Sequence, residues 1–263
     1  MEYNFKNKKI YYKLSGKGRL LLLLHGFTES SEIWDDFTPI LKKNYACLSI
    51  DLPGHGNSEA LPEAHTMEVM AEIVKNIIDI SGFKDCIMIG HSMGGYVALA
   101  FAEAYPEYLK GLCLFHSSAL DDTPEIMKNR DKTIEIVKNN KFSFLSQFIP
   151  DLFAPENKSK FQNEILKLVK SSESMSVEGI INAIVGMKMR KNHEETLIHI
   201  KCPVLFIAGK KDSRVPLDKV ILQIALPRHA ESLILDNVGH MGYIEEKDLT
   251  LKTILFFANK IYF

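Results

Sequence analysis

The sequence contains few cysteines, and they show neither of the patterns by which cysteine organises a small fold or a metal site. Cys47, Cys86, Cys113 and Cys202 are spaced too widely for a CxxC pair or a metal knuckle. Three of them lie inside short apolar runs, and Cys202 begins a fourth run. We therefore expect buried, free thiols in a reducing compartment, and we expect neither a metal nor a cofactor.

Long hydrophobic runs and an excess of charge of one sign are also missing. The most apolar stretch, Leu20–Leu24, has five residues, whereas a membrane-spanning helix needs about 20. Lys and Arg number 32 against 33 Asp and Glu, for a formal net charge of -1. This balance predicts no nucleic-acid or membrane partner, and the N-terminal segment has no secretory signal pattern. We expect a cytoplasmic monomer or homodimer that acts on a small molecule.

What the 263 residues do contain is an alternation of short apolar runs with longer segments of helical periodicity. Such runs are typical of strands buried on both faces of a parallel sheet. The pattern predicts an α/β fold, a mostly parallel sheet flanked by helices, with an antiparallel hairpin over 4–13 at its edge. The expected strands are Leu20–Leu24, Tyr45–Ile50, Cys86–Ile89, Leu112–Phe115, Val204–Ala208 and Leu233–Leu235.

One segment interrupts this alternation. Residues 121–195 contain no strand-like run, only helical periodicity rich in Phe and Met. An all-helical block between two strands indicates an insertion. We therefore expect a core made of residues 1–120 and 196–263, with a helical cap over 121–195.

A serine motif lies between an expected strand and an expected helix. Gly90-His91-Ser92-Met93-Gly94 matches G-x-S-x-G. A sharp strand-to-helix turn holds such a serine in a strained conformation that exposes its hydroxyl, and it crowds the residues two before and two after the serine. Both of those residues are glycine here. The context favours Ser92 as a nucleophile over an incidental serine in a glycine-rich turn.

A serine nucleophile needs a base, and the base needs an acid to orient it. His240 follows the last apolar run, and Asp212 follows the run before it. Catalytic groups gather at the carboxyl ends of strands in such sheets. The order Ser92, Asp212, His240 is the one expected for a hydrolase of this architecture. Asp121 and Asp122, which follow another apolar run, are the rival acids.

The oxyanion of an acyl-transfer intermediate needs two backbone donors. Met93 offers one at a helix N-terminus, and Phe27 offers the other in the early loop that Gly26 allows to turn tightly. The side chains that we expect to contact substrate are Phe27, His116, Phe144, Phe148, Met187 and Met189. A hydrogen-bonded position behind the site is an equal alternative for His116.

Three further polar residues have structural interpretations. Asp51 and His55 belong to the tight turn DLPGHGNS, in which an aspartate can bond the local backbone. His91 is expected to point sideways into packing and not into the site.

Taken together, LLLHGF, DLPGHGNS, GHSMGG, GKKDSRVP and NVGHMGYIEE resemble, in order and spacing, the α/β-hydrolase superfamily, in its single-domain, esterase-like branch with a helical cap. The resemblance spans nearly the whole chain except 121–195. It implies the fold and a Ser92–His240–Asp212 triad, but it says little about substrate. Serine at the elbow, where other branches have aspartate, argues against the haloalkane dehalogenases and epoxide hydrolases.

These observations predict a carboxylic ester hydrolase for a small to medium apolar acyl group, acting through an acyl-enzyme on Ser92. Two alternatives remain open. The first is a carbon–carbon bond hydrolase, lyase or enol-lactonase of the same fold, for which Lys188, Arg190 and Lys191 are the cap cations that could hold a substrate carboxylate. The second is a non-catalytic receptor that closes its cap on a ligand.

Overall fold

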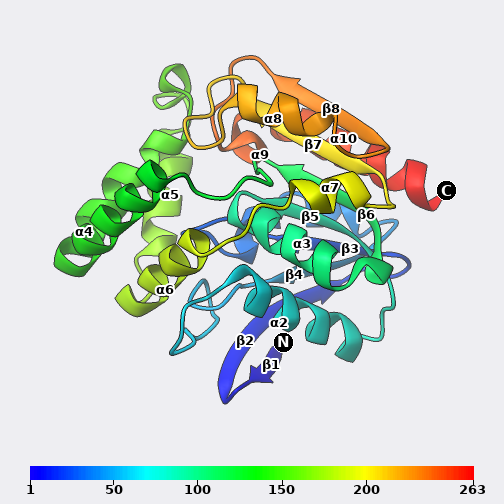
Figure 1. Ribbon diagram of the computed structural model, residues 1–263, viewed down its shortest axis with the longest axis horizontal. Helices are drawn as coiled ribbons and strands as arrows, with labels where there is room; N and C mark the ends of the chain where they lie inside the picture. Colours follow the sequence, from blue (N-terminus) through cyan, green and yellow to red (C-terminus); the bar gives the residue numbers. More distant parts are fainter.

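A single eight-stranded sheet forms the centre of the computed structural model, which describes residues 1–263 (Figure 1). The strand order is β1-β2-β4-β3-β5-β6-β7-β8. The hairpin β1–β2 is antiparallel and joins β4 antiparallel, while all other neighbours run parallel. The strands are β1 Glu2–Phe5, β2 Lys8–Ser15, β3 Leu20–Leu24, β4 Ala46–Ile50, β5 Cys86–His91, β6 Leu109–Phe115, β7 Val204–Gly209 and β8 Ala230–Leu235. The predicted mostly parallel α/β sheet is confirmed.

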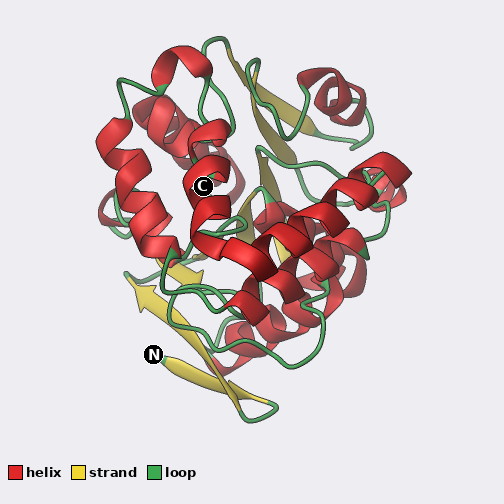
Figure 2. Cartoon of the chain, turned by 90° about the vertical axis from the view of Figure 1, so that its left-hand side faces the viewer, coloured by secondary structure: helices red, strands yellow, loops and turns green.

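The five leucines of β3 show why the central strands are continuously apolar. Successive side chains of a strand point to opposite faces of the sheet. Leu20, Leu22 and Leu24 pack into the larger hydrophobic core, whereas Leu21 and Leu23 pack into a second core on the other face. Both faces of the sheet are therefore dry, and helices cover each of them (Figure 2).

Different helices close the two cores. Helices α2, α3, α8 and α7 (Glu194–His199) pack on the larger core, and α1 and α10 pack on the second. Helix α2 begins at a side-chain cap, because the Thr66 hydroxyl accepts from the Val69 N–H, and its chain turns away at Gly82 with φ 81. The helices of the body are α1 Thr38–Leu41, α2 Met67–Ile80, α3 Met93–Ala104, α8 Leu217–Ile224, α9 Gly242–Glu245 and α10 Lys247–Tyr262, with short 3-10 turns η1 Ser31–Trp34 and η2 Pro106–Tyr108.

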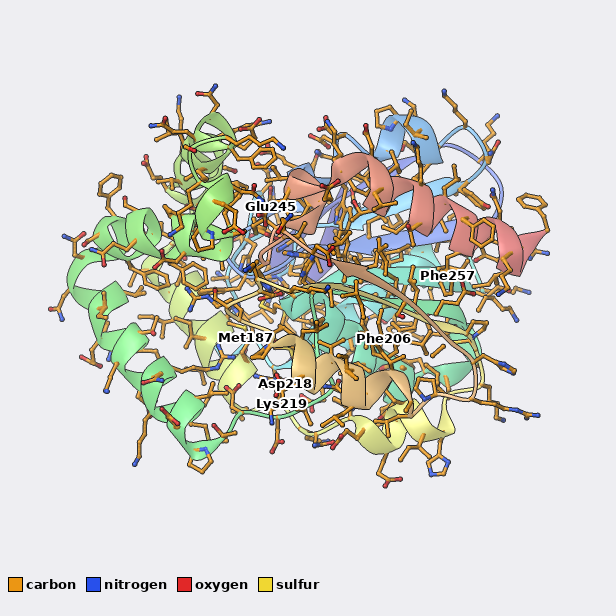
Figure 3. All side chains as sticks on the ribbon, turned by 90° about the horizontal axis from the view of Figure 1, so that it is seen from above. Met187, Phe206, Asp218, Lys219, Glu245 and Phe257 are labelled. Atoms are coloured by element: carbon orange, nitrogen blue, oxygen red, sulfur yellow. The ribbon has the colours of Figure 1, made fainter.

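Between β6 and β7 the chain is entirely helical. Helices α4, α5 and α6 gather at one end of the sheet (Figure 1), and Met187 of α6 lies where they meet the body (Figure 3). Helix α4 is kinked at Asn140 (φ -157, ψ 84), whose Oδ1 accepts from the Ser143 N–H and so starts the second half. The elements are α4 Pro124–Phe148, η3 Pro150–Leu152, η4 Pro155–Asn157, α5 Gln162–Ser172, α6 Val177–Lys188 and α7 Glu194–His199.

Two of the parallel strands begin three residues before their apolar runs. Strand β6 starts at Leu109 and β8 at Ala230. Strand β8 lies at the sheet edge, where its outward side chains are exposed and polar residues are tolerated. The four cysteines are free and buried. None of the helices combines the length and the apolar character that crossing a bilayer requires.

Candidate active site

Ser92 occupies a strained turn between β5 and α3. Its φ is 49, in a region that non-glycine residues rarely adopt. Neither flanking glycine leaves room for a side chain. A Cβ on Gly90 would lie 2.4 Å from the carbonyl oxygen of Gly94, and a Cβ on Gly94 would lie 2.6 Å from the carbonyl oxygen of Leu24. The turn leaves the half-buried Ser92 side chain on the wall of a cavity.

His240 contacts the serine from the loop after β8. Its Nε2 lies 2.8 Å from Ser92 Oγ and its Nδ1 lies 2.8 Å from Asp212 Oδ2. Because the carboxylate can only accept, Nδ1 carries the proton and Nε2 is left to accept from the serine hydroxyl. The backbone N–H of His240 donates to the carbonyl oxygen of Leu152 at 2.6 Å. The structure thus brings together the three residues proposed from the sequence order.

Asp212 receives four hydrogen bonds. Its Oδ1 accepts from the backbone N–H groups of Arg214 and Val215 at 2.8 and 2.9 Å. Its Oδ2 accepts from His240 and also from Nδ1 of His116 at 3.0 Å. Burial by itself raises the pKa of Asp212, but the interactions with His240 and His116 outweigh it and hold the pKa well below its ordinary value. The carboxylate is therefore ionised throughout the neutral range.

His116 lies behind the site and not in it. It is fully buried, has φ 49 and does not line the cavity, so the expectation that it contacts substrate is corrected. Burial lowers the pKa of His116 to about 4, against the opposing effect of Asp212. A neutral His116 donates one hydrogen bond to Asp212 and places no second positive charge beside His240.

The rival acids are engaged elsewhere or lie in solvent. The buried carboxylate of Asp122 pairs with Arg130 and Arg190, and Asp121 is exposed. Neither makes a hydrogen bond or an ion pair with His240. Asp51, as expected for a turn residue, accepts from the backbone N–H groups of Ser31 and Asn57.

A buried ion pair between Glu29 and His91 lies against the turn that holds Ser92. His91 Nδ1 is 2.9 Å from Glu29 Oε2, and His91 Nε2 is 2.9 Å from the carbonyl oxygen of His240. Both ring nitrogens face acceptors, so both donate and the ring is an imidazolium. Burial lowers the pKa of His91, but the Glu29 charge outweighs it and the net shift is upward. Burial raises the pKa of Glu29, and His91 reverses that shift.

Glu29 also fixes the loop that carries Phe27. Its Oε2 accepts from the Gly26 N–H at 2.6 Å, and its Oε1 accepts from the Tyr243 hydroxyl at 3.1 Å. The Phe27 N–H makes no hydrogen bond within the protein, and Met93 is the first residue of α3, so its N–H has no acceptor within that helix. Both backbone donors that the sequence suggested are therefore free.

The cavity beside Ser92 has a volume of about 400 Å³, in the size range of small-molecule sites. Its apolar side is a cluster in which Phe27 packs on Phe148 (ring centroids 5.7 Å apart) and Phe144 stacks on Phe148 (5.1 Å). Met187 also lines it. Met189 was expected to do so but is 59% exposed and lies outside the lining, because it is the residue that ends α6.

The arginines that line this cavity are not the cap cations predicted from the sequence. Lys188 and Lys191 form surface pairs with Asp131 and Glu68, and Arg190 lies under the Tyr96 ring. None of these three lines the cavity. The arginines that do line it are Arg130 of α4 and Arg214, and the His91 imidazolium, which is paired with Glu29, also lies in its wall.

His116, Asp212 and His240 also form a group of potential metal ligands, whose ligand atoms lie within 4.8 Å of one another. The donor chemistry does not fit a metal. Both imidazoles direct a protonated Nδ1 at the same carboxylate oxygen, whereas a metal requires the nitrogen lone pair.

Comparison with known proteins places this geometry in a family. A family model described as "alpha/beta hydrolase fold" matches residues 19–247. A pimeloyl-[acyl-carrier protein] methyl ester esterase of Wigglesworthia glossinidia brevipalpis is 27% identical, covering 96% of this chain and 99% of its own. A 2-hydroxy-6-oxononadienedioate/2-hydroxy-6-oxononatrienedioate hydrolase of Paraburkholderia phymatum is 25% identical, covering 96% and 91%.

Solved structures agree with the sequence relatives. The malate-bound structure of a thermophilic esterase from Thermogutta terrifontis superimposes with a TM-score of 0.92 at 27% identity, covering 97% of this chain and 95% of its own. An enol-lactonase from Burkholderia xenovorans, at 20% identity and a TM-score of 0.91, shares the fold, covering 98% of this chain and 100% of its own. The chain belongs to the α/β-hydrolase family and is a hydrolase.

Proposed function

We propose that this hydrolase cleaves carboxylic esters through an acyl-enzyme on Ser92. The observation that carries the proposal is the chain of two 2.8 Å hydrogen bonds from Ser92 Oγ through His240 to Asp212, at the wall of a cavity. An activated serine of this kind is the nucleophile of acyl-transfer enzymes. Relatives named as methyl ester esterases support the same chemistry.

The first half of the reaction forms the acyl-enzyme. Ser92 Oγ attacks the ester carbonyl carbon while His240 Nε2 takes the hydroxyl proton. The oxyanion lies between the Phe27 and Met93 N–H groups, which are each worth about 3–4 kcal/mol in such sites. Collapse breaks the bond to the leaving alcohol, and His240 returns its proton to the alkoxide oxygen. Asp212 stabilises the imidazolium between these two transfers.

The second half of the reaction hydrolyses the acyl-enzyme and regenerates the free Ser92 hydroxyl. Water attacks the acyl carbon as His240 takes one of its protons, and the second intermediate expels Ser92 Oγ, which recovers the proton. The products are a carboxylic acid and an alcohol. The phenylalanine cluster of the cavity suits an apolar part of the substrate.

A fluorophosphonate probe tests the nucleophile. We expect it to label the wild type and not the Ser92→Ala variant, and we expect p-nitrophenyl acetate to give a pre-steady-state burst equal to the enzyme concentration. A Ser118→Ala variant is the matched control, because Ser118 lies on another loop and bonds Gln223. Equal labelling of wild type and Ser92→Ala would overturn the proposal, and no labelling of the wild type would favour a receptor.

Carbon–carbon bond cleavage is the second candidate, favoured by the relative named as a 2-hydroxy-6-oxononadienedioate/2-hydroxy-6-oxononatrienedioate hydrolase. It would use the same three residues. Turnover of a vinylogous diketone at a higher kcat/KM than any ester of the same acyl length would select this candidate over the first.

A further inference from the structure

The cavity that contains Ser92 and His240 has a positively charged lining. Arg130 and Arg214 both contribute to its wall. The one acidic lining residue, Glu29, is already neutralised by the His91 imidazolium. A cavity with an aromatic cluster on one side therefore carries an excess of positive charge that nothing else in its lining balances.

The charge at Arg130 follows from the pairing of Asp122. One buried carboxylate, that of Asp122, faces two guanidinium groups, those of Arg130 and Arg190. Arg190 also donates to the carbonyl oxygens of Leu120 and Met187, and its side chain is 7% exposed. Arg190 is thus the structural partner, and the cluster keeps one positive charge, which Arg130 presents at the cavity wall.

Arg130 has donors to spare. Its Nε and Nη2 bond Asp122, but its Nη1 meets only the Met187 sulfur at 3.6 Å, and a thioether is a weak acceptor. Two polar residues of α4 lie on the same wall: Asn129, which precedes Arg130, and Thr133, one helical turn further along. An amide and a hydroxyl therefore accompany the guanidinium.

The Arg214 guanidinium also has unused N–H donors, but for a different reason. Its guanidinium lies 4.7 Å from the centroid of the Phe148 ring, and its side chain makes no hydrogen bond or ion pair within the protein. Stacking on a ring orients a guanidinium without using its in-plane N–H groups. The residue is solvent-exposed at the wall of the cavity, so a ligand can reach these donors from within the cavity.

We propose that this cavity takes an ester that carries a carboxylate remote from the scissile bond, held by Arg130 and Arg214. The inference rests on the proposed ester hydrolysis and adds the class of substrate. A guanidinium matches a carboxylate with two parallel N–H···O bonds, and the single excess charge of the Asp122 cluster matches a monoanion. The half-esters of dicarboxylic acids have this form, with the phenylalanine cluster against the methylene chain.

The test compares two substrates that differ by one charge. Monomethyl and dimethyl adipate share the same acyl chain and the same kind of methyl ester bond, and initial rates of methanol release, halved for the two equivalent ester groups of dimethyl adipate, give kcat/KM per ester group. We expect the wild type to favour the monomethyl ester by about tenfold or more, the worth of one charge-assisted pair. We expect that ratio to fall about tenfold in Arg130→Gln and in Arg214→Gln.

Two controls separate binding from folding. Arg130→Lys keeps the charge and is expected to restore most of the ratio, while Lys188→Gln removes a cation that pairs with Asp131 outside the cavity and is expected to leave the ratio unchanged. Arg214 is exposed, so its variant does not depend on core packing. A wild-type ratio near or below one, or a ratio that neither arginine variant changes, overturns the proposal.

Calorimetry with Ser92→Ala keeps this proposal distinct from the ester chemistry. Monomethyl adipate is expected to bind this variant about tenfold more tightly than dimethyl adipate, and the added Arg214→Gln change is expected to remove the difference. Tight binding without turnover by the wild type would reject ester hydrolysis and keep the carboxylate subsite. Equal binding of the two esters would reject the subsite whatever the turnover.

Discussion

Glu29 and His91 lie 62 positions apart in the sequence, yet Glu29 Oε2 accepts from His91 Nδ1 at 2.9 Å in the buried interior. The pair joins three segments of the active site. Glu29 holds the Gly26 N–H, His91 belongs to the elbow, and His91 Nε2 donates to the carbonyl oxygen of His240. One pair of charges thus connects the loop that carries Phe27, the turn that carries Ser92 and the loop that carries His240.

Replacing Glu29 by Gln is expected to damage both stability and rate. Three donors converge on the Glu29 carboxylate, and one amide oxygen cannot accept from all of them. Removing one partner of a buried pair costs about 3–5 kcal/mol. Urea unfolding measures the loss of stability, and kcat with p-nitrophenyl acetate is expected to fall because the loop carrying Phe27 is released.

Glu32→Gln is the control for that substitution, because Glu32 is exposed three residues away. The double variant Glu29→Gln/His91→Gln is expected to be more stable than the sum of the two single changes predicts. A Glu29→Gln protein within about 0.5 kcal/mol of wild type would show that the pair contributes little.

Replacing Asp212 by Asn is expected to lower kcat by about three to four orders of magnitude, because the amide can stabilise the wrong His240 tautomer. Burst kinetics with a p-nitrophenyl ester measure the effect. The control is Asp121→Asn, a rival acid by sequence that lies in solvent and is expected to keep wild-type kcat. Comparable losses in both variants would contradict the assignment of Asp212.

Replacing Gly90 by Ala is expected to destabilise the fold by about 3 kcal/mol or more and to abolish labelling of Ser92. The new Cβ would lie 2.4 Å from the backbone oxygen of Gly94, which cannot move without displacing α3. Chemical denaturation measures the change. Gly82→Asn is the control, because no atom lies within 4 Å of its Cβ position and Asn tolerates φ 81.

Stability is expected to fall as the pH is lowered from about 6.5 to 4. Burial lowers the pKa values of His65 and His116 from 6.5 to about 4. The unfolded chain therefore binds protons in this window that the folded chain does not, so stability rises with pH across it and is constant above it for these groups. His65→Gln is expected to flatten the slope of the unfolding free energy by up to about 1.4 kcal/mol per pH unit.

The exposed His199 provides the comparison for that measurement. His199→Gln is expected to leave the slope unchanged. An identical slope in wild type and His65→Gln, measured by urea unfolding at each pH, would show that His65 is protonated equally in both states.

Much of the fold could be predicted because a parallel sheet buried on both faces leaves a direct trace in the sequence. Leu20–Leu24 feeds two cores with alternate residues, so the whole strand is apolar. Strand β8 was predicted only over Leu233–Leu235 because an edge strand does not need this pattern. The turn at Ser92 could be predicted because close backbone contacts exclude a side chain at Gly90 and Gly94.

The parts of the site that escaped prediction depend on distant partners. Glu29 in HGFTES looks like an ordinary polar residue of a turn, and nothing near it in sequence indicates a buried imidazolium. Arg130 lies in the charged stretch KNRDK, which is typical of a solvated helix face. Arg130 adds positive charge to the cavity because it shares the Asp122 carboxylate with Arg190, and only the tertiary structure shows this sharing.

The hydrogen bond from the His240 N–H to the Leu152 carbonyl oxygen has a consequence for recombination. Ala154 is attached to the same region, since its N–H donates to Glu245, which also accepts from Gly239. The short segment Pro150–Leu152 therefore holds the His240 loop in place, although it lies in the chain among the helices between β6 and β7. A chimaera that replaces α4 must therefore place its downstream junction before Pro150, because a replacement that runs through Leu152 also changes the contact that holds the His240 loop.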